Sequence, residues 1–161
     1  MQLLLSPTVI KRLRRELRRA GSREIGGLLM GEHLGDERFR IVEISVQRAG
    51  GSRACFIRHP TQHRAQLDRF FERTGHDYAR YNYLGEWHSH PSFAPIPSAT
   101  DAQTMQSLIH DPATGAEFIV LLIATLSGTS MGVSATAFAA NVAPKSVAVV
   151  IESGSVERVI G

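Results

Sequence analysis

Two histidines one residue apart are the most informative feature of this sequence, in the segment GEWHSHPSFAPIPSATD. If the chain is extended there, His88 and His90 lie on the same face of a strand, because side chains alternate between faces. Asp101 follows beyond a proline-rich loop that can fold back toward them. Two imidazoles and one carboxylate leave the fourth position of a tetrahedral zinc open to water, which is typical of a catalytic site. Such a metal suits hydrolysis, because it activates water and polarises a carbonyl group.

Asp101 also has a second interpretation. The pattern Ser98-x-x-Asp101 is typical of a helix start, in which the serine side chain accepts a backbone N–H. The two interpretations are compatible, because an acid in the first turn of a helix can also face a metal. A His-x-His pair alone is common without a metal, so the hypothesis of a metal site depends on the aspartate and the loop as well.

A hydrolytic site of this kind needs a carboxylate that takes a proton from water and delivers it to the leaving amine. We favour Glu24, because it begins the apolar segment EIGGLLMG, where a surface charge is not expected. Glu86 is the competitor, since strand alternation places it on the same face as His88 and His90. It remains open as a base or as a group that supports the ligands.

Composition narrows the remaining possibilities. The chain has 161 residues, 43% of them hydrophobic, which predicts one globular domain spanning 1–161. Its single cysteine, Cys55, stands against seven histidines. An internal disulfide and a thiolate-based zinc site are therefore excluded, as is the Pro-Cys-x-x-Cys segment of the zinc deaminases. We expect Cys55 to be a small buried residue rather than a nucleophile.

Hydrophobic periodicity and turn residues predict an α/β domain with a mixed sheet. An amphipathic helix is expected around 10–19, a second helix capped by Thr61 and closed by Gly75, and a third over 98–110 after a loop at 91–97. In the second helix, Leu67, Phe70 and Phe71 form the apolar stripe. Strands are expected over 24–31, 37–47, 54–57, 81–88, 118–124, 131–138 and 146–152, with a turn at 49–52.

These residues together resemble the JAMM (JAB/MPN+) metallopeptidases, through the upstream glutamate, the His-x-His pair, and the serine and aspartate that follow. The resemblance implies an MPN/JAB-like fold of cytidine-deaminase-like architecture, a mixed β-sheet flanked by helices, with one Zn²⁺ per chain. It implies that His88, His90 and Asp101 bind the zinc. It also implies that Glu24 is the general acid/base and that Ser98 donates a hydrogen bond to the oxyanion of the tetrahedral intermediate.

Within that family, the short chain with YLGEWHSHP is similar to stand-alone bacterial members, which are found beside E1-like and E2-like enzymes, including antiphage conjugation systems. The similarity implies a deubiquitinase-like isopeptidase that cleaves after the C-terminal glycine of a ubiquitin-like protein, in deconjugation or in precursor processing. Its expected partners are that protein, its conjugates, and E1-like and E2-like enzymes. Two alternatives remain: processing of sulfur-carrier proteins, and a non-catalytic module that binds a ubiquitin-like tail.

The charge is unevenly distributed, since residues 1–80 carry 16 of the 18 basic side chains. Many of them lie in the helix expected at 11–19, whose basic face is either simply solvated or a docking surface for an acidic protein or nucleic acid. Nucleic acid is not the expected partner, because this stretch has no aromatic residue. We find no signal peptide and no apolar segment of about 20 residues, and so expect a soluble, cytoplasmic protein without membrane contact.

Overall fold

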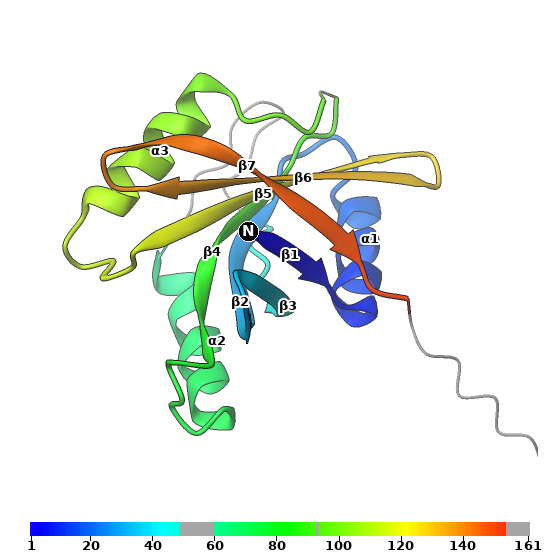
Figure 1. Cartoon of the computed structure of the whole chain (residues 1–161). Helices are drawn as coiled ribbons and strands as arrows, with labels where there is room; N and C mark the ends of the chain where they lie inside the picture. The colour runs from blue at the N-terminus through cyan, green and yellow to red at the C-terminus, as the bar shows by residue number, and fades with distance from the viewer. Residues whose placement is uncertain (49–59, 93, 154–161) are drawn as a thin grey trace, which may run out of the picture.

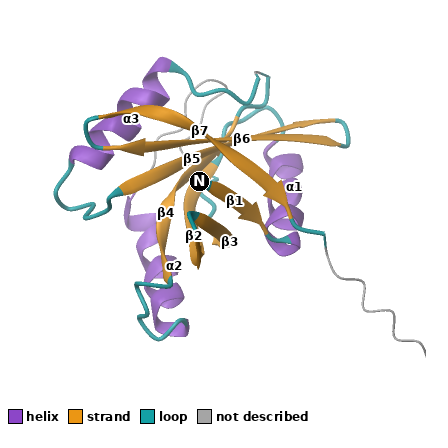
Figure 2. Ribbon diagram, viewed as in Figure 1, coloured by secondary structure: helices purple, strands orange, loops and turns teal. Residues whose placement is uncertain are grey.

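A computed structural model describes residues 1–48, 60–92 and 94–153, in which seven strands form a mixed sheet that closes into a barrel. Around the barrel the strand order is β1-β3-β2-β4-β5-β6-β7, and β7 pairs with β1 (Figures 1 and 2). Three helices lie outside the barrel. The elements in chain order are β1 (Gln2–Leu5), α1 (Pro7–Ala20), β2 (Gly26–Gly35), β3 (Arg38–Ile44), α2 (Pro60–Arg73), β4 (Tyr81–Ser89), α3 (Ala99–His110), β5 (Phe118–Ser127), β6 (Ser130–Ala139) and β7 (Val142–Ile151).

The strand β1 closes the barrel, and no local sequence pattern predicts it. It runs parallel to both of its neighbours, β3 and β7, and its Leu3 and Leu5 side chains are fully buried. Four residues are too few to show the alternation that predicts a strand. The expected mixed sheet is therefore confirmed, and its closure is a feature that only the long-range pairing of β1 produces.

The strand β5 is covered on both faces, which explains its continuous apolar run. Val120 and Leu122 point into the barrel core, together with Trp87 and the leucines of β1. Leu121 and Ile123 point outward and pack against Met105 of α3. A strand buried on both faces needs no polar side, because neither face meets water.

A β-bulge in β4 determines which of its residues face α3. Leu29 of β2 pairs with Gly85, but the next residue of β2 pairs with Tyr83, so β4 carries one extra residue. Leu84 and Trp87 both belong to the barrel core, although they are three positions apart. Beyond the bulge the even-numbered residues of β4, His88 among them, therefore face outward toward α3.

Gly85 is required at this bulge for two reasons. Its φ of 138° lies in a region that L-residues rarely adopt. In addition, a Cβ atom placed there would lie 2.5 Å from the amide nitrogen of Val120 and 2.8 Å from its carbonyl carbon. The backbones of β4 and β5 thus approach at a position where no side chain fits.

The first helix begins at Pro7, earlier than expected, and the second begins before its expected cap. Ser6 precedes α1 and accepts a hydrogen bond from the Val9 amide. Thr61, expected to cap α2, lies inside that helix, which already includes Pro60; proline is well suited to a first helical turn, where no N–H partner is needed. Gly75 follows α2 at φ 65°, as expected for a residue that ends a helix.

A buried histidine attaches α2 to the barrel. His63 Nδ1 lies 2.7 Å from Ser45 Oγ, and His63 Nε2 lies 3.1 Å from the Gln47 side-chain oxygen. Ser45 also accepts from the Leu28 amide, and its carbonyl accepts from the Trp87 indole N–H. These hydrogen bonds hold the segment after β3 against β2 and β4, beside the strands that carry the site.

Several expectations concern residues outside the described ranges. The turn at 49–52, the strand at 54–57 and Cys55 are among them. The other expected strands and the third helix are confirmed. However, β2 begins at Gly26 rather than at residue 24, so Glu24 lies just before it, and β7 begins at Val142 rather than at residue 146. Among the described residues, none of the helices is both long and apolar enough to span a bilayer.

The account of Gly85 gives a stability prediction. Gly85→Ala should lower the free energy of unfolding by about 2–4 kcal/mol, because it adds a strained φ to a clash with the β5 backbone. Gly75→Ala is the matched control: its φ is also positive, but a Cβ there meets nothing within 4 Å. Its cost should be only about 1 kcal/mol. Urea unfolding measures both, and equal costs would show that the space at Gly85 is not limiting.

Candidate metal centre

The strand β4 brings two imidazoles together at its carboxyl end. His88 and His90 both lie on its outward face and are buried, and their Nε2 atoms are 3.1 Å apart. The two side chains converge because they are two residues apart in an extended chain. The same-face arrangement expected from the sequence is therefore confirmed.

Asp101 reaches the same place from the first turn of α3. Its Oδ1 lies 3.5 Å from His88 Nε2, and its Oδ2 lies 3.7 Å from His90 Nε2. Ligands bound about 2.0 Å from a tetrahedral zinc are about 3.3 Å from one another, close to these separations. The three side chains thus form a group that can hold a metal ion, with ligand atoms within 4.8 Å of one another. Three protein ligands would leave one coordination position open.

Asp101 and Ser98 also cap α3. Asp101 is therefore positioned both to cap the helix and to bind a metal, the two roles expected from the sequence. Ser98 Oγ accepts a hydrogen bond from the Asp101 amide at 3.1 Å, and Asp101 Oδ2 accepts from the Ser98 amide at 2.7 Å. This capping box orients the carboxylate toward the histidines. The Ser98 side chain thus accepts from the Asp101 amide, and its hydrogen bond to the Asp101 carboxyl group also lowers the pKa of that group.

The electrostatics of the site keep Asp101 ionised. Partial burial alone would raise the pKa of its carboxyl group. The hydrogen bond and charge of His88, together with the hydrogen bonds from Ser98, outweigh burial and hold the pKa well below its usual range. An ionised carboxylate beside two imidazole nitrogens is the donor set that suits zinc.

Glu24 is placed opposite the histidines by the pairing of β2 with β4. Gly26 pairs with His88 in an antiparallel register, and this register continues to Ile25 and Ser89. The Ser89 amide donates to the Ile25 carbonyl at 2.8 Å, and the Ile25 amide donates to Ser89 Oγ at 3.0 Å. Glu24 therefore falls opposite His90, on the same face of the sheet. The register between β2 and β4 thus places the favoured glutamate near the site, as expected from the sequence.

Burial raises the pKa of the Glu24 carboxyl group, while His88 and His90 act in the opposite direction. The Glu24 side chain is only 5% exposed. A buried carboxyl group with a raised pKa, beside a cluster that can bind a metal, is a common feature of catalytic acid–base groups.

The two glycines that follow Glu24, Gly26 and Gly27, leave room for the His88 imidazole and for the segment after β3. Gly26, opposite His88, has no side chain to cover the imidazole. A Cβ on Gly27 would lie 2.7 Å from the carbonyl carbon of Ser45 and 2.7 Å from its Oγ atom. No side chain fits at Gly27, where the backbone of β2 touches the segment after β3.

The loop after β4 orients His90 through a contact that no sequence motif predicts. His90 Nδ1 lies 3.0 Å from the Ala94 carbonyl, which can only accept, so Nδ1 carries the proton and Nε2 is left as the metal-binding atom. The next carbonyl, of Pro95, accepts a hydrogen bond from Ser134 on β6. Ser134 is a positioning residue that no motif identifies, because only the fold brings β6 beside this loop.

Glu86 is also buried on the outward face of β4, two residues before His88. Its position is as expected from strand alternation. The structure therefore brings five of the six candidate side chains to one end of the sheet: Glu24, His88, His90, Ser98 and Asp101. Glu86 lies two residues before His88 on β4, farther from this end.

An α/β domain with an open His-His-Asp group is of the class that can hold one hydrolytic metal ion. The comparison with protein families identifies the class more closely. Residues 6–139 match the model of the prokaryotic homologues of the JAB domain, and the chain belongs to this family. The matched range includes every residue of the candidate site.

Two curated relatives share more specific similarity. A protein of Vibrio cholerae serotype O1 named "CD-NTase/cGAS isopeptidase" is 38% identical over 80 residues, 48% of this chain and 49% of the relative. A protein of Enterobacter hormaechei subsp. hoffmannii with the same name is 30% identical over 109 residues, 66% of this chain and 57% of the relative. The chain thus spans about half the length of these relatives.

A solved structure supports the fold independently. The solution structure of a protein from Desulfitobacterium hafniense superposes with a TM-score of 0.71 at 19% identity, and the match covers 94% of both chains. At this identity the likeness concerns the fold alone.

The dual position of Asp101 gives a prediction that separates its roles. Asp101→Asn should lower zinc affinity by more than about 100-fold, because it replaces a charged ligand. Replacing a residue that only hydrogen-bonds to a metal ligand typically lowers the affinity by about 10–100-fold. The amide oxygen can still accept from the Ser98 amide, so the variant should lose only about 1 kcal/mol of stability. Chelator competition measures the affinity. Asp111→Asn, at the other end of α3, is the matched control, and equal affinity in the two variants would refute Asp101 as a ligand.

Proposed function

We propose that this chain is a JAMM-type zinc-dependent isopeptidase that cleaves after the C-terminal glycine of a ubiquitin-like protein. The observation that carries the proposal is the His88, His90 and Asp101 group with the buried Glu24 opposite it. The names of the two relatives support isopeptide cleavage over the processing of sulfur-carrier proteins. One Zn²⁺ held by the three side chains would supply activation of water and polarisation of the scissile carbonyl.

Two residues of the chain would carry out the other steps of hydrolysis, which are proton transfer and stabilisation of the tetrahedral intermediate. Glu24 takes a proton from the attacking water as the water oxygen bonds to the carbonyl carbon. The Ser98 hydroxyl donates to the oxygen that becomes negative in the tetrahedral intermediate. The C–N bond then breaks, and Glu24 delivers the proton to the leaving amine. The raised pKa of Glu24 makes its carboxylate a stronger base, which favours the first of these transfers, the uptake of the proton from water.

We also propose the kind of substrate. The relatives are named for CD-NTase and cGAS, so the target from which this chain removes a ubiquitin-like protein is proposed to be an enzyme of that kind, in an antiphage pathway. E1-like and E2-like enzymes would then form the conjugate that this chain cleaves. We place this reaction in the cytoplasm.

The role of Glu24 can be tested against its competitor. Glu24→Gln should reduce the cleavage of a ubiquitin-like fusion by about 10²–10⁴-fold, the usual contribution of a general acid–base group, with zinc retained at one ion per chain. Glu86→Gln, a buried glutamate on the neighbouring strand, should retain most of the activity. Single-turnover cleavage and metal analysis measure the two effects. Loss of zinc in Glu24→Gln would make Glu24 a ligand, and a larger loss in Glu86→Gln would reverse the assignment.

The role of Ser98 leads to a separate prediction, because it also caps α3. Ser98→Ala should lower kcat with little change in KM, by about 2.7–4 kcal/mol of barrier if the hydroxyl stabilises the oxyanion. Loss of the cap alone would cost about 1 kcal/mol of folding stability. Steady-state kinetics and thermal unfolding separate the two. If Ser98→Ala turned over like the parent, the residue would be a helix cap only.

A further inference from the structure

The helix α1 carries a stripe of basic side chains that form no ion pair with any residue the structure describes. We define the basic stripe as Lys11, Arg14 and Arg18, which lie on one face of α1 because they are three and four residues apart. Among the described residues, none of the three forms an ion pair. Lys11 and Arg18 are exposed, and Arg14 is half-buried. No described residue of the chain accounts for these three charges.

The neighbouring side chains Arg15 and Arg19 differ from the basic stripe, because both contact an acidic residue of the same helix. Glu16, almost fully buried, binds Arg48 at 2.7 Å and Arg15 at 3.2 Å, and lies 3.7 Å from Arg19. Burial alone would raise the pKa of Glu16, but the hydrogen bonds and charges of Arg48 and Arg15 hold it below its usual value. These arginines therefore balance the charge of a buried glutamate, whereas the basic stripe has no such role among the described residues.

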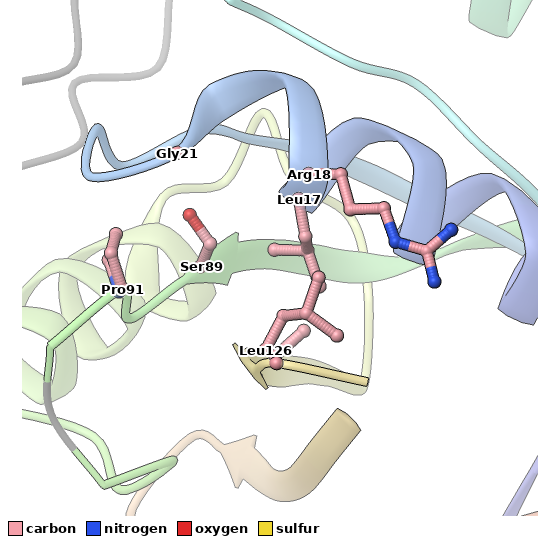
Figure 3. Close-up of a pocket in the computed structure, with 8 residues that line it drawn as sticks. Leu17, Arg18, Gly21, Ser89, Pro91 and Leu126 are labelled. Carbon is pink, nitrogen blue, oxygen red and sulfur yellow. The ribbon is translucent and has the colours of Figure 1, made fainter. Parts of the chain in front are cut away.

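The basic stripe leads to a cavity of about 150 Å³ at the end of α1. Leu17 and Leu126 meet there across the gap between α1 and β5, while the Arg18 side chain extends back along the helix, away from Ser89 and Pro91 (Figure 3). Among the described residues, no acidic side chain lines the cavity. Its lining consists of Leu17, Arg18, Gly21, Ser89, Pro91, Ala124, Leu126 and Gly128. A cavity of about 150 Å³ has room for a group the size of benzene, and Leu17 and Leu126 supply an apolar part of its wall beside the polar groups of Arg18 and Ser89.

The cavity lies directly behind the candidate metal centre. Ser89 and Pro91, which line it, are the two chain neighbours of His90. The side chain of Ser89 points away from the face that carries His88 and His90, as its hydrogen bond to Ile25 requires. A chain that crosses the end of β4 therefore passes from the metal centre to this cavity within a few residues.

We propose that the basic stripe and this cavity form a docking surface for an acidic segment of the protein substrate, with an aliphatic side chain in the cavity and its carboxylates along α1. The inference rests on the proposed function, which places a protein substrate at His90. The three cations form no ion pair with a described residue and so complement several carboxylates, and the two leucines of the cavity complement an aliphatic group. Nucleic acid fits less well, because neither α1 nor the cavity wall has an aromatic side chain for stacking on bases.

The test uses the full chain and a fluorescein-labelled peptide in which one leucine precedes six alternating aspartates and glutamates. Its binding is measured by anisotropy at low and high salt. The test variant is Lys11→Gln/Arg14→Gln/Arg18→Gln. The control variant, Arg38→Gln/Arg69→Gln/Lys145→Gln, removes one lysine and two arginines from exposed positions elsewhere. Thermal unfolding verifies that both variants fold.

We expect the test variant to bind the acidic peptide about 10-fold or more weakly, with less dependence on salt, and the control variant to stay within about 2-fold of the parent. Replacing the leucine of the peptide by glycine should weaken binding to the parent but not to Leu126→Asn. The control for the cavity is Leu34→Asn, a half-buried leucine of β2. Equal binding by the test and control variants would overturn the proposal.

A single-stranded thymidine oligonucleotide of similar charge completes the test. If it displaced the peptide and bound more tightly with the same dependence on the basic stripe, a protein segment would be the wrong occupant. The assay measures binding and needs neither zinc nor cleavage. Cleavage of a ubiquitin-like fusion without stripe-dependent peptide binding would therefore refute the docking surface alone, and peptide binding without cleavage would refute the proposed function alone.

Discussion

The candidate site depends on the antiparallel register between β2 and β4. Gly26 pairs with His88, and the hydrogen bonds between Ile25 and Ser89 extend this pairing beyond the end of β2. A shift by one residue would move Glu24 away from the histidines and turn its side chain to the other face of the sheet. Residues that lie far apart in the sequence are thus aligned mainly by backbone hydrogen bonds, and the chemistry follows from that alignment.

Two glycines make this register possible, each for a steric reason. Gly85 allows the bulge that turns the even-numbered residues of β4 outward, at a position pressed against the Val120 backbone. Gly27 allows β2 to touch Ser45, which holds both the Leu28 amide and the ring of His63. The metal-binding face therefore depends on contacts on the opposite, buried side of the same strands.

The local parts of this arrangement could be predicted from the sequence. The strand that carries His88 and the capped helix that carries Asp101 are encoded by nearby residues, through alternation and through the serine of the capping box. Glu24 was predicted because an acid at the start of an apolar strand needs a reason to be there. The family match over residues 6–139 agrees with these local patterns.

The remaining parts depend on contacts that no local pattern encodes. The strand β1 is too short to show a period, and it exists because β3 and β7 offer it hydrogen bonds on both sides. The start of α2 was misplaced because Pro60 is itself compatible with a first helical turn. The contact of Ser134 with the loop that orients His90, and the cavity behind that histidine, arise only when distant strands meet.

The most direct test of the central claim is X-ray absorption at the zinc edge of the zinc-loaded chain. The account predicts one zinc per chain with two imidazole nitrogens at about 2.0–2.1 Å, oxygen ligands at about 2.0–2.2 Å and no sulfur. The outer-shell scattering typical of imidazole should correspond to two histidines. A sulfur ligand at about 2.3 Å, or a spectrum unchanged when His88 and His90 are both replaced, would contradict it.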